Sequence, residues 1–202
     1  MERSLDRNNF SRGIPKPFGA ANWVTSIRAV AAVAFLAAGL ATLADAGLLS
    51  ATLRWLIAVL ATVMLCLDGL DGYLARRLGS ASAFGARFDL EVDALMTLAL
   101  ALLAWVSGQA GGWVLLSGLM RYIFVVAGWL WPALAVALPP RRRRQAICVA
   151  QTIALILGLS PLLAPPWSTT ICLAGLLLLT YSFAVDLAWL TGRPQAESEV
   201  AY

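Results

Sequence analysis

Six long apolar segments alternate with short polar connections along the chain. They run over about residues 23–43, 52–78, 84–106, 113–138, 145–163 and 169–190. Each segment is close to or above the roughly 20 residues that a membrane-spanning helix needs. The connections contain the small, polar and proline residues that end helices. The pattern predicts an all-α, polytopic membrane protein with six transmembrane helices.

Polar stretches flank the apolar part of the chain. Residues 1–20 and 191–202 are polar, and residues 21–190 contain all six segments. No short apolar core with a cleavage site follows the first stretch, so we do not expect a cleaved signal peptide. We predict one transmembrane domain between a polar N-terminal segment and a polar tail.

Arginines are divided unequally between the two sides that six spans would define. The connections on the side opposite to the N-terminus contain only Arg54. Those on the side of the N-terminus, with the tail, contain Arg76, Arg77, Arg87, Arg141, Arg142, Arg143, Arg144 and Arg193. Because basic residues gather on the cytoplasmic side of a membrane, we expect both termini in the cytoplasm. The expected location is the inner (cytoplasmic) membrane of a bacterial-type cell.

The composition of the chain excludes several kinds of partner and catalytic group. Hydrophobic residues make up 60% of the chain, and the formal net charge is +4. The basic residues lie at membrane edges, so we expect no nucleic-acid partner. The chain has no histidine, which excludes a histidine base or metal ligand. Its three cysteines lie inside apolar segments, without the spacing of a zinc site or a disulfide framework.

A group of charged and small residues lies near the end of the second apolar segment. It contains Asp68, Asp71 and Arg76, with Gly72 and Ala75 between them. At about 100° per residue in a helix, all five fall on one face. Ionisable residues in membrane-spanning segments are costly and mark functional sites by default.

The third apolar segment opens with a matching group. Gly85, Asp89 and Asp93 follow one another at intervals of four residues, so they form one helical stripe. If the two helices face each other, four carboxylates surround a small space. Their mutual repulsion and all-oxygen chemistry favour a hard divalent cation, Mg²⁺ or Mn²⁺, most simply two ions. The alternative is that these carboxylates only cap helices or pair with arginines.

Together the two groups read Asp-x2-Asp-Gly-x2-Ala-Arg-x8-Gly-x3-Asp-x3-Asp. This pattern resembles, at every position, the signature of the CDP-alcohol phosphotransferase family. The resemblance implies an enzyme of phospholipid synthesis, a homodimer in many members, that moves a substituted phosphoryl group from a CDP-linked substrate to an alcohol and releases CMP. The small size of the chain and its cluster of arginines favour CDP-diacylglycerol, taken from the lipid bilayer, as the donor, with a small alcohol as the acceptor.

The resemblance assigns roles to individual residues. The implied metal ligands are Asp68, Asp71, Asp89 and Asp93. Asp93 is also the implied general base. The residues implied to surround CDP are Gly72, Ala75, Arg76 and Gly85. Many family members also carry Asn-x2-Thr-x2-Arg near the nucleotide site, which here is Asn22, Thr25 and Arg28. The alternative for Asn22 is a helix cap.

The acceptor is less defined. The chain resembles phosphatidylglycerophosphate and phosphatidylinositol-phosphate synthases, and this resemblance implies that basic residues at the start of the fifth span bind an acceptor phosphate. The corresponding candidates here are Arg121, Arg141, Arg142, Arg143 and Arg144. Four arginines replace the Gly-Lys-x-Lys-Thr of many phosphatidylglycerophosphate synthases. The alternatives are that the arginine run only fixes topology and contacts anionic lipid, and that Arg121 pairs with a carboxylate of the motif helices. For Asp186 we expect a basic partner.

Two other functions remain open from the sequence. The first is transfer from CDP-choline or CDP-ethanolamine to a lipid alcohol, which uses the same motif. The second is a cation-coupled transporter with intramembrane carboxylates. A transporter would predict interrupted helices and internal repeats, and the sequence has neither pattern.

Overall fold

The computed structural model describes residues 20–45, 48–78, 83–130 and 142–191. These residues form an all-helical bundle with six α-helices, as predicted. The helices are α1 (Ala20–Ala44), α2 (Ala51–Leu78), α3 (Ala83–Val106), α4 (Leu116–Leu130), α5 (Arg142–Leu159) and α6 (Trp167–Thr191), and a short 3₁₀ helix (Gly112–Leu115) leads into α4.

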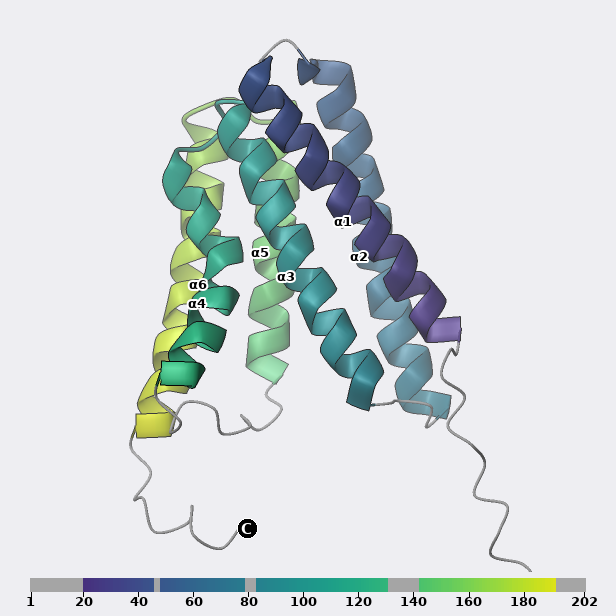
Figure 1. Ribbon diagram of the computed structural model, residues 1–202. Helices are drawn as coiled ribbons and strands as arrows, with labels where there is room; N and C mark the ends of the chain where they lie inside the picture. The colour runs from purple at the N-terminus through teal and green to yellow at the C-terminus, as the bar shows by residue number, and fades with distance from the viewer. Residues whose placement is uncertain (1–19, 46–47, 79–82, 131–141, 192–202) are drawn as a thin grey trace, which may run out of the picture.

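Successive helices run in opposite directions along the bundle (Figure 1). We call the end where α2 finishes at Leu78 and α3 begins at Ala83 the motif end. The first residue of α1 and the last residue of α6 also lie at the motif end. This arrangement agrees with an even number of crossings.

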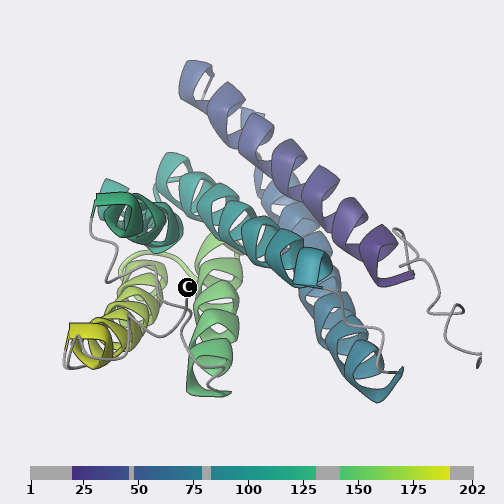
Figure 2. The ribbon, with the colours of Figure 1, turned by 60° about the horizontal axis from the view of Figure 1, so that its bottom comes forward.

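Helix α3 occupies the centre of the bundle. It packs against α1, α4 and α5, while α6 covers the other side of α5 (Figure 2). The half of α3 farther from the motif end forms the apolar core, where Leu100 and Leu103 are fully buried. Phe35 of α1 and Leu155 of α5 pack into the same core. The site therefore rests on helices that are fixed by apolar packing at their other ends.

A glycine allows α4 to approach α3 closely. A Cβ atom at Gly118 would overlap the backbone of Leu98 on α3. Any larger residue there would push the two helices apart. Gly108, in the turn after α3, has a φ of 71°, a conformation that glycine adopts without steric penalty.

The outer surface of the bundle is apolar. Large side chains such as Val30, Trp129 and Trp167 are more than two-thirds exposed. Within the described part of the chain, four helical stretches are long and apolar enough to cross a membrane: Val24–Ala44, Ala51–Gly69, Gly112–Leu130 and Trp167–Leu190. Exposed apolar surface on this scale is typical of a lipid-facing protein.

Helices α3 and α5 are absent from these four candidate spans. The first half of α3 carries Arg87, Asp89, Glu91 and Asp93, and α5 begins with three arginines. Charged residues thus reduce the apolar length of the two helices that lie nearest the site. The prediction of six transmembrane helices stays a prediction for α3 and α5.

Two predicted segments differ from the observed helices in their bounds. The fourth segment was expected as one helix from residue 113, but the structure forms a 3₁₀ helix before α4 begins at Leu116. Residues 131–138 of that segment lie outside the described residues. The fifth helix starts at Arg142 rather than Gln145 and ends at Leu159 rather than Leu163. Pro161 explains the early end, because proline disfavours helical conformation in the residue before it.

Candidate metal centre

Three of the four predicted carboxylates converge at one site. Asp68 comes from α2, and Asp89 and Asp93 come from successive turns of α3. One oxygen from each carboxylate can be chosen so that all three lie within 4.8 Å of one another. The two motif helices therefore bring their acidic residues together as the sequence predicts. Asp71 lies in α2, but its side chain is outside the described set.

Arg28 of α1 lies between these carboxylates. Its Nη1 donates to Asp68 and to Asp89, the latter at 2.7 Å, and its Nη2 donates to Asp93. Arg28 is only 4% exposed. Three carboxylates and one guanidinium leave two negative charges at this site, so one divalent cation would make it neutral.

The helical stripe on α3 explains this convergence. Asp93 follows Asp89 by four residues, so both point to the side of α3 where Arg28 and Asp68 lie. Glu91, two residues from each, points away and accepts a hydrogen bond from Arg121 of α4. Arg121 thus has the carboxylate partner on a motif helix that the sequence offered as an alternative.

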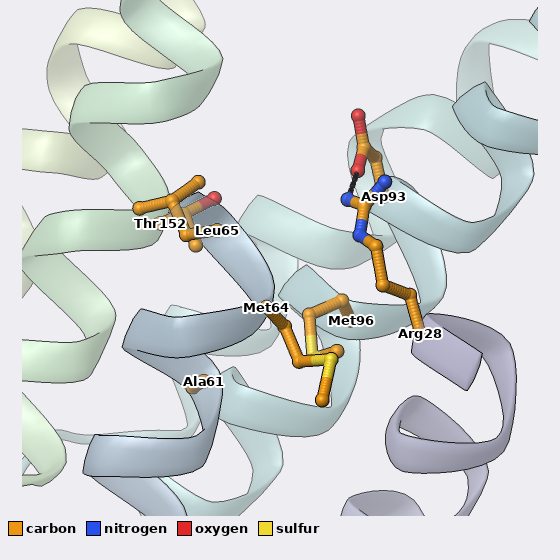
Figure 3. A pocket seen from close by; sticks show the side chains of 7 residues that line it. All are labelled: Arg28, Ala61, Met64, Leu65, Asp93, Met96 and Thr152. Atoms are coloured by element: carbon orange, nitrogen blue, oxygen red, sulfur yellow. Dashed lines mark hydrogen bonds and ion pairs between the residues drawn. The ribbon is translucent and has the colours of Figure 1, made fainter. Parts of the chain in front are cut away.

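A small, open cleft adjoins Asp93. It lies between α1, α2, α3 and α5, and Figure 3 shows Arg28 and Asp93 facing each other at one side of it. The rest of its lining is mainly apolar: Ala61, Met64, Leu65 and Met96, with Thr152 from α5. The site therefore combines a charged wall with an apolar one.

The arginines at the start of α5 are tied to the end of α6. Asp186 accepts from Nη2 of Arg143 at 2.9 Å and lies 3.2 Å from Nε of Arg144. Asp186 is buried, whereas each arginine side chain is about a third exposed. This confirms the expected basic partner of Asp186. It also fixes two of the candidate acceptor-binding arginines at the motif end.

The other predicted site residues are only partly described. Gly85 lies one turn before Asp89 on α3, and Thr25 lies three residues before Arg28 on α1. The remaining predictions concern side chains outside the described set: Asn22, Gly72, Ala75, Arg76 and Arg142, with Arg141 outside the described residues altogether.

The contacts of Arg28 with the carboxylates were not predicted from the sequence. The residue was quoted as part of Asn-x2-Thr-x2-Arg but was given no function. An arginine within an apolar segment needs an anionic partner, and this was the available signal. It could not show that the partners are the carboxylates of α2 and α3.

The carboxylates fit a divalent cation. Mg²⁺ binds oxygen ligands at about 2.0–2.1 Å, so two oxygens on one ion are at most about 4.2 Å apart. The three described carboxylate oxygens lie within 4.8 Å of one another, which is close to that limit. The donor set contains only oxygen, which suits Mg²⁺ or Mn²⁺ better than a softer metal.

Comparison with known proteins gives a consistent result. A family model described as CDP-alcohol phosphatidyltransferase matches residues 18–185, which include every described helix of the site. No solved structure matches the chain. The match covers most of the chain rather than the acidic motif alone.

Proposed function

This chain belongs to the CDP-alcohol phosphatidyltransferase family, an enzyme family of phospholipid synthesis, and we propose that it transfers a phosphatidyl group from CDP-diacylglycerol to a small, phosphorylated alcohol. The observation that carries the proposal is the convergence of Asp68, Asp89 and Asp93 from two helices of the family motif. The family match also favours an enzyme over a cation-coupled transporter.

The proposed chemistry needs a metal, a base and a place for each substrate. A divalent cation at the three carboxylates would neutralise the diphosphate and stabilise the charge that develops on its oxygens during transfer. Asp93 takes the proton from the acceptor hydroxyl. The hydroxyl oxygen then bonds to the β-phosphorus, the bond from that phosphorus to the bridging oxygen breaks, and CMP leaves with the bridging oxygen.

Residues of both motif helices are proposed to bind CDP. We assign this role to Gly72, Ala75, Arg76 and Gly85, with Asn22 and Thr25 of α1. We also propose Asp71 as the fourth metal ligand and a second ion beside the first. A glycine at position 85 is consistent with this assignment, because it has no side chain that would keep a bulky ligand away from α3 one turn before Asp89.

The acceptor is proposed to lie along α5. Arg144, Cys148 and Thr152 are four residues apart and share one face of α5. Thr152 lines the cleft that Asp93 also lines, and Arg144 lies about 12 Å nearer the motif end. A small alcohol with its hydroxyl at Asp93 could therefore place its phosphate near Arg143 and Arg144. We include Arg141 and Arg142 in this proposal, whereas the ion pair with Glu91 favours a structural role for Arg121.

We propose that all six helices cross the membrane and that the motif end faces the cytoplasm. The apolar outer surface and the common end of the first and last described helices support this arrangement. Family analogy further suggests a homodimer in a bacterial-type inner membrane.

Release of CMP by the purified protein tests the function. We expect CMP from CDP-diacylglycerol only when a suitable alcohol and Mg²⁺ or Mn²⁺ are present. Glycerol 3-phosphate and an inositol phosphate should be better acceptors than glycerol and inositol. Release of CMP from CDP-choline with diacylglycerol, but not from CDP-diacylglycerol, would overturn the proposed direction of transfer.

A further inference from the structure

Arg28 contacts one oxygen atom of each described carboxylate in the candidate metal centre. Its guanidinium donates to the Oδ1 atoms of Asp68, Asp89 and Asp93. A Mg²⁺ ion that bound through the same Oδ1 atoms would lie about 2.1 Å from each of them, and a guanidinium could not remain among them. Arg28 and a divalent cation therefore compete for these carboxylate oxygens.

The side chain of Arg28 also has little access to water. The residue is 4% exposed, and it lies within a long apolar helix. An arginine in such surroundings needs an anionic partner, because a buried unpaired charge is strongly unfavourable. If a metal takes the carboxylates, the guanidinium must find another anion nearby.

The CDP-linked substrate would supply that anion. Its diphosphate would bind the same metal, and a guanidinium can donate to phosphate through two parallel hydrogen bonds. The Nε atom of Arg28 is buried and has no hydrogen-bond partner among the described residues. Nε and one Nη atom together form the fork that suits a phosphate group.

We propose that Arg28 is a mobile counter-ion that holds the three carboxylates before metal binds and moves to the diphosphate of the CDP-linked substrate once metal has taken them. This inference rests on the proposed function for the identity of the substrate. The exchange would give the buried guanidinium an anionic partner both before and after metal binds. It would also make metal loading a condition for tight substrate binding.

The test measures Mn²⁺ and CDP binding to the purified full-length protein, without turnover. We compare wild type with Arg28→Met, which removes the charge, and Arg28→Lys, whose single ammonium cannot span three carboxylates. Arg87→Met is the matched control, because Arg87 is an exposed arginine two residues before Asp89. Free Mn²⁺ is followed by electron paramagnetic resonance, and CDP binding is measured at saturating Mn²⁺.

We expect Arg28→Met to bind Mn²⁺ at least ten-fold more tightly than wild type and CDP at least ten-fold more weakly. Arg28→Lys should change both affinities in the same directions but by smaller factors. It replaces Arg28→Met in the test if that variant does not fold. Arg87→Met should change either affinity less than three-fold. In the presence of a chelator, Arg28→Met should have a lower melting temperature than wild type. Addition of Mn²⁺ should remove this difference in melting temperature.

Two results would overturn the inference. Unchanged or weaker Mn²⁺ binding in both Arg28 variants would mean that the arginine does not compete with metal. Unchanged CDP affinity in both would mean that it does not reach the diphosphate. Neither result touches the proposed function, which fails instead if wild type binds no Mn²⁺ or releases no CMP.

Discussion

At the scale of single residues, Asp93 has the most demanding role in the proposed chemistry. It lies in the carboxylate cluster, contacts Arg28 and lines the cleft that could admit an acceptor. Of the three described carboxylates, Asp93 is the one that lines this cleft. We therefore propose Asp93, rather than Asp68 or Asp89, as the base.

Replacement of Asp93 by asparagine should abolish turnover while leaving CDP binding largely intact. An amide cannot accept the hydroxyl proton, and loss of a general base lowers rates by roughly 10²–10⁴-fold. Asp68 and Asp89 would still bind metal. The measurement is CMP release beside CDP affinity, with Asp45→Asn, an exposed residue at the opposite end of the bundle, as the control. Turnover at the wild-type rate in Asp93→Asn would remove Asp93 as the base.

The spacing of the aspartates made their convergence predictable, but the contacts of Arg28 were not predictable. Intervals of four residues fix which side of α3 carries Asp89 and Asp93, whatever surrounds the helix. Arg28 belongs to a different helix, and its partners depend on how α1 packs against α3. No local pattern contains that information.

At the scale of helices, α5 and α6 position the proposed acceptor site. The end of α6 presents buried Asp186 to the start of α5, where it fixes Arg143 and Arg144. The predicted fifth segment began after these arginines, because it was identified from its run of apolar residues. Arginine is nevertheless a good helix former, so α5 begins within the arginine run.

Replacing Arg143 or Arg144 by alanine should weaken binding of the acceptor but not binding of CDP-diacylglycerol. A hydrogen bond to a charged group contributes about 1.5–3 kcal/mol, so the acceptor KM should rise about 10–100-fold while the KM for CDP-diacylglycerol stays constant. Lysine should restore part of the effect, since it keeps the charge but loses the planar fork. Arg87→Ala, outside α5, is the control.

Separate KM values for the acceptor and for CDP-diacylglycerol decide this prediction, and the same measurement extends to Arg121, Arg141 and Arg142. Unchanged acceptor KM in all five single variants would leave the arginine run with a topological role. The acceptor would then be an uncharged alcohol.

At the scale of the whole molecule, the sequence predicted the number of helices but not their arrangement. Long apolar runs separated by glycine, proline and polar residues were sufficient for the bounds of α1, α2, α3 and α6. The central position of α3 was not predictable, because apolar lipid-facing and core-facing surfaces have similar composition in a membrane protein. Small residues such as Gly118 determine close approach, and their partners become visible only in the fold.

Both ends of the chain should lie in the cytoplasm. The arginine asymmetry and the common end of α1 and α6 lead to this expectation. A reporter that is active only in the cytoplasm should work when fused to the C-terminus, and it should fail when fused after Asp45, in the connection between α1 and α2. The reverse pattern would place the motif end outside the cytoplasm and contradict the proposed access to a cytosolic acceptor.

The proposed phosphatidyl transfer depends most on a divalent cation bound at Asp68, Asp89 and Asp93. Anomalous diffraction from crystals soaked in Mn²⁺ tests this directly, because it locates the metal without reference to activity. We predict an anomalous peak in contact with these three carboxylates, with the guanidinium of Arg28 moved away from them. Two results together would contradict a metal-dependent transfer. The crystals would show no Mn²⁺ at the carboxylates, and the same protein would release CMP at its full rate in excess chelator.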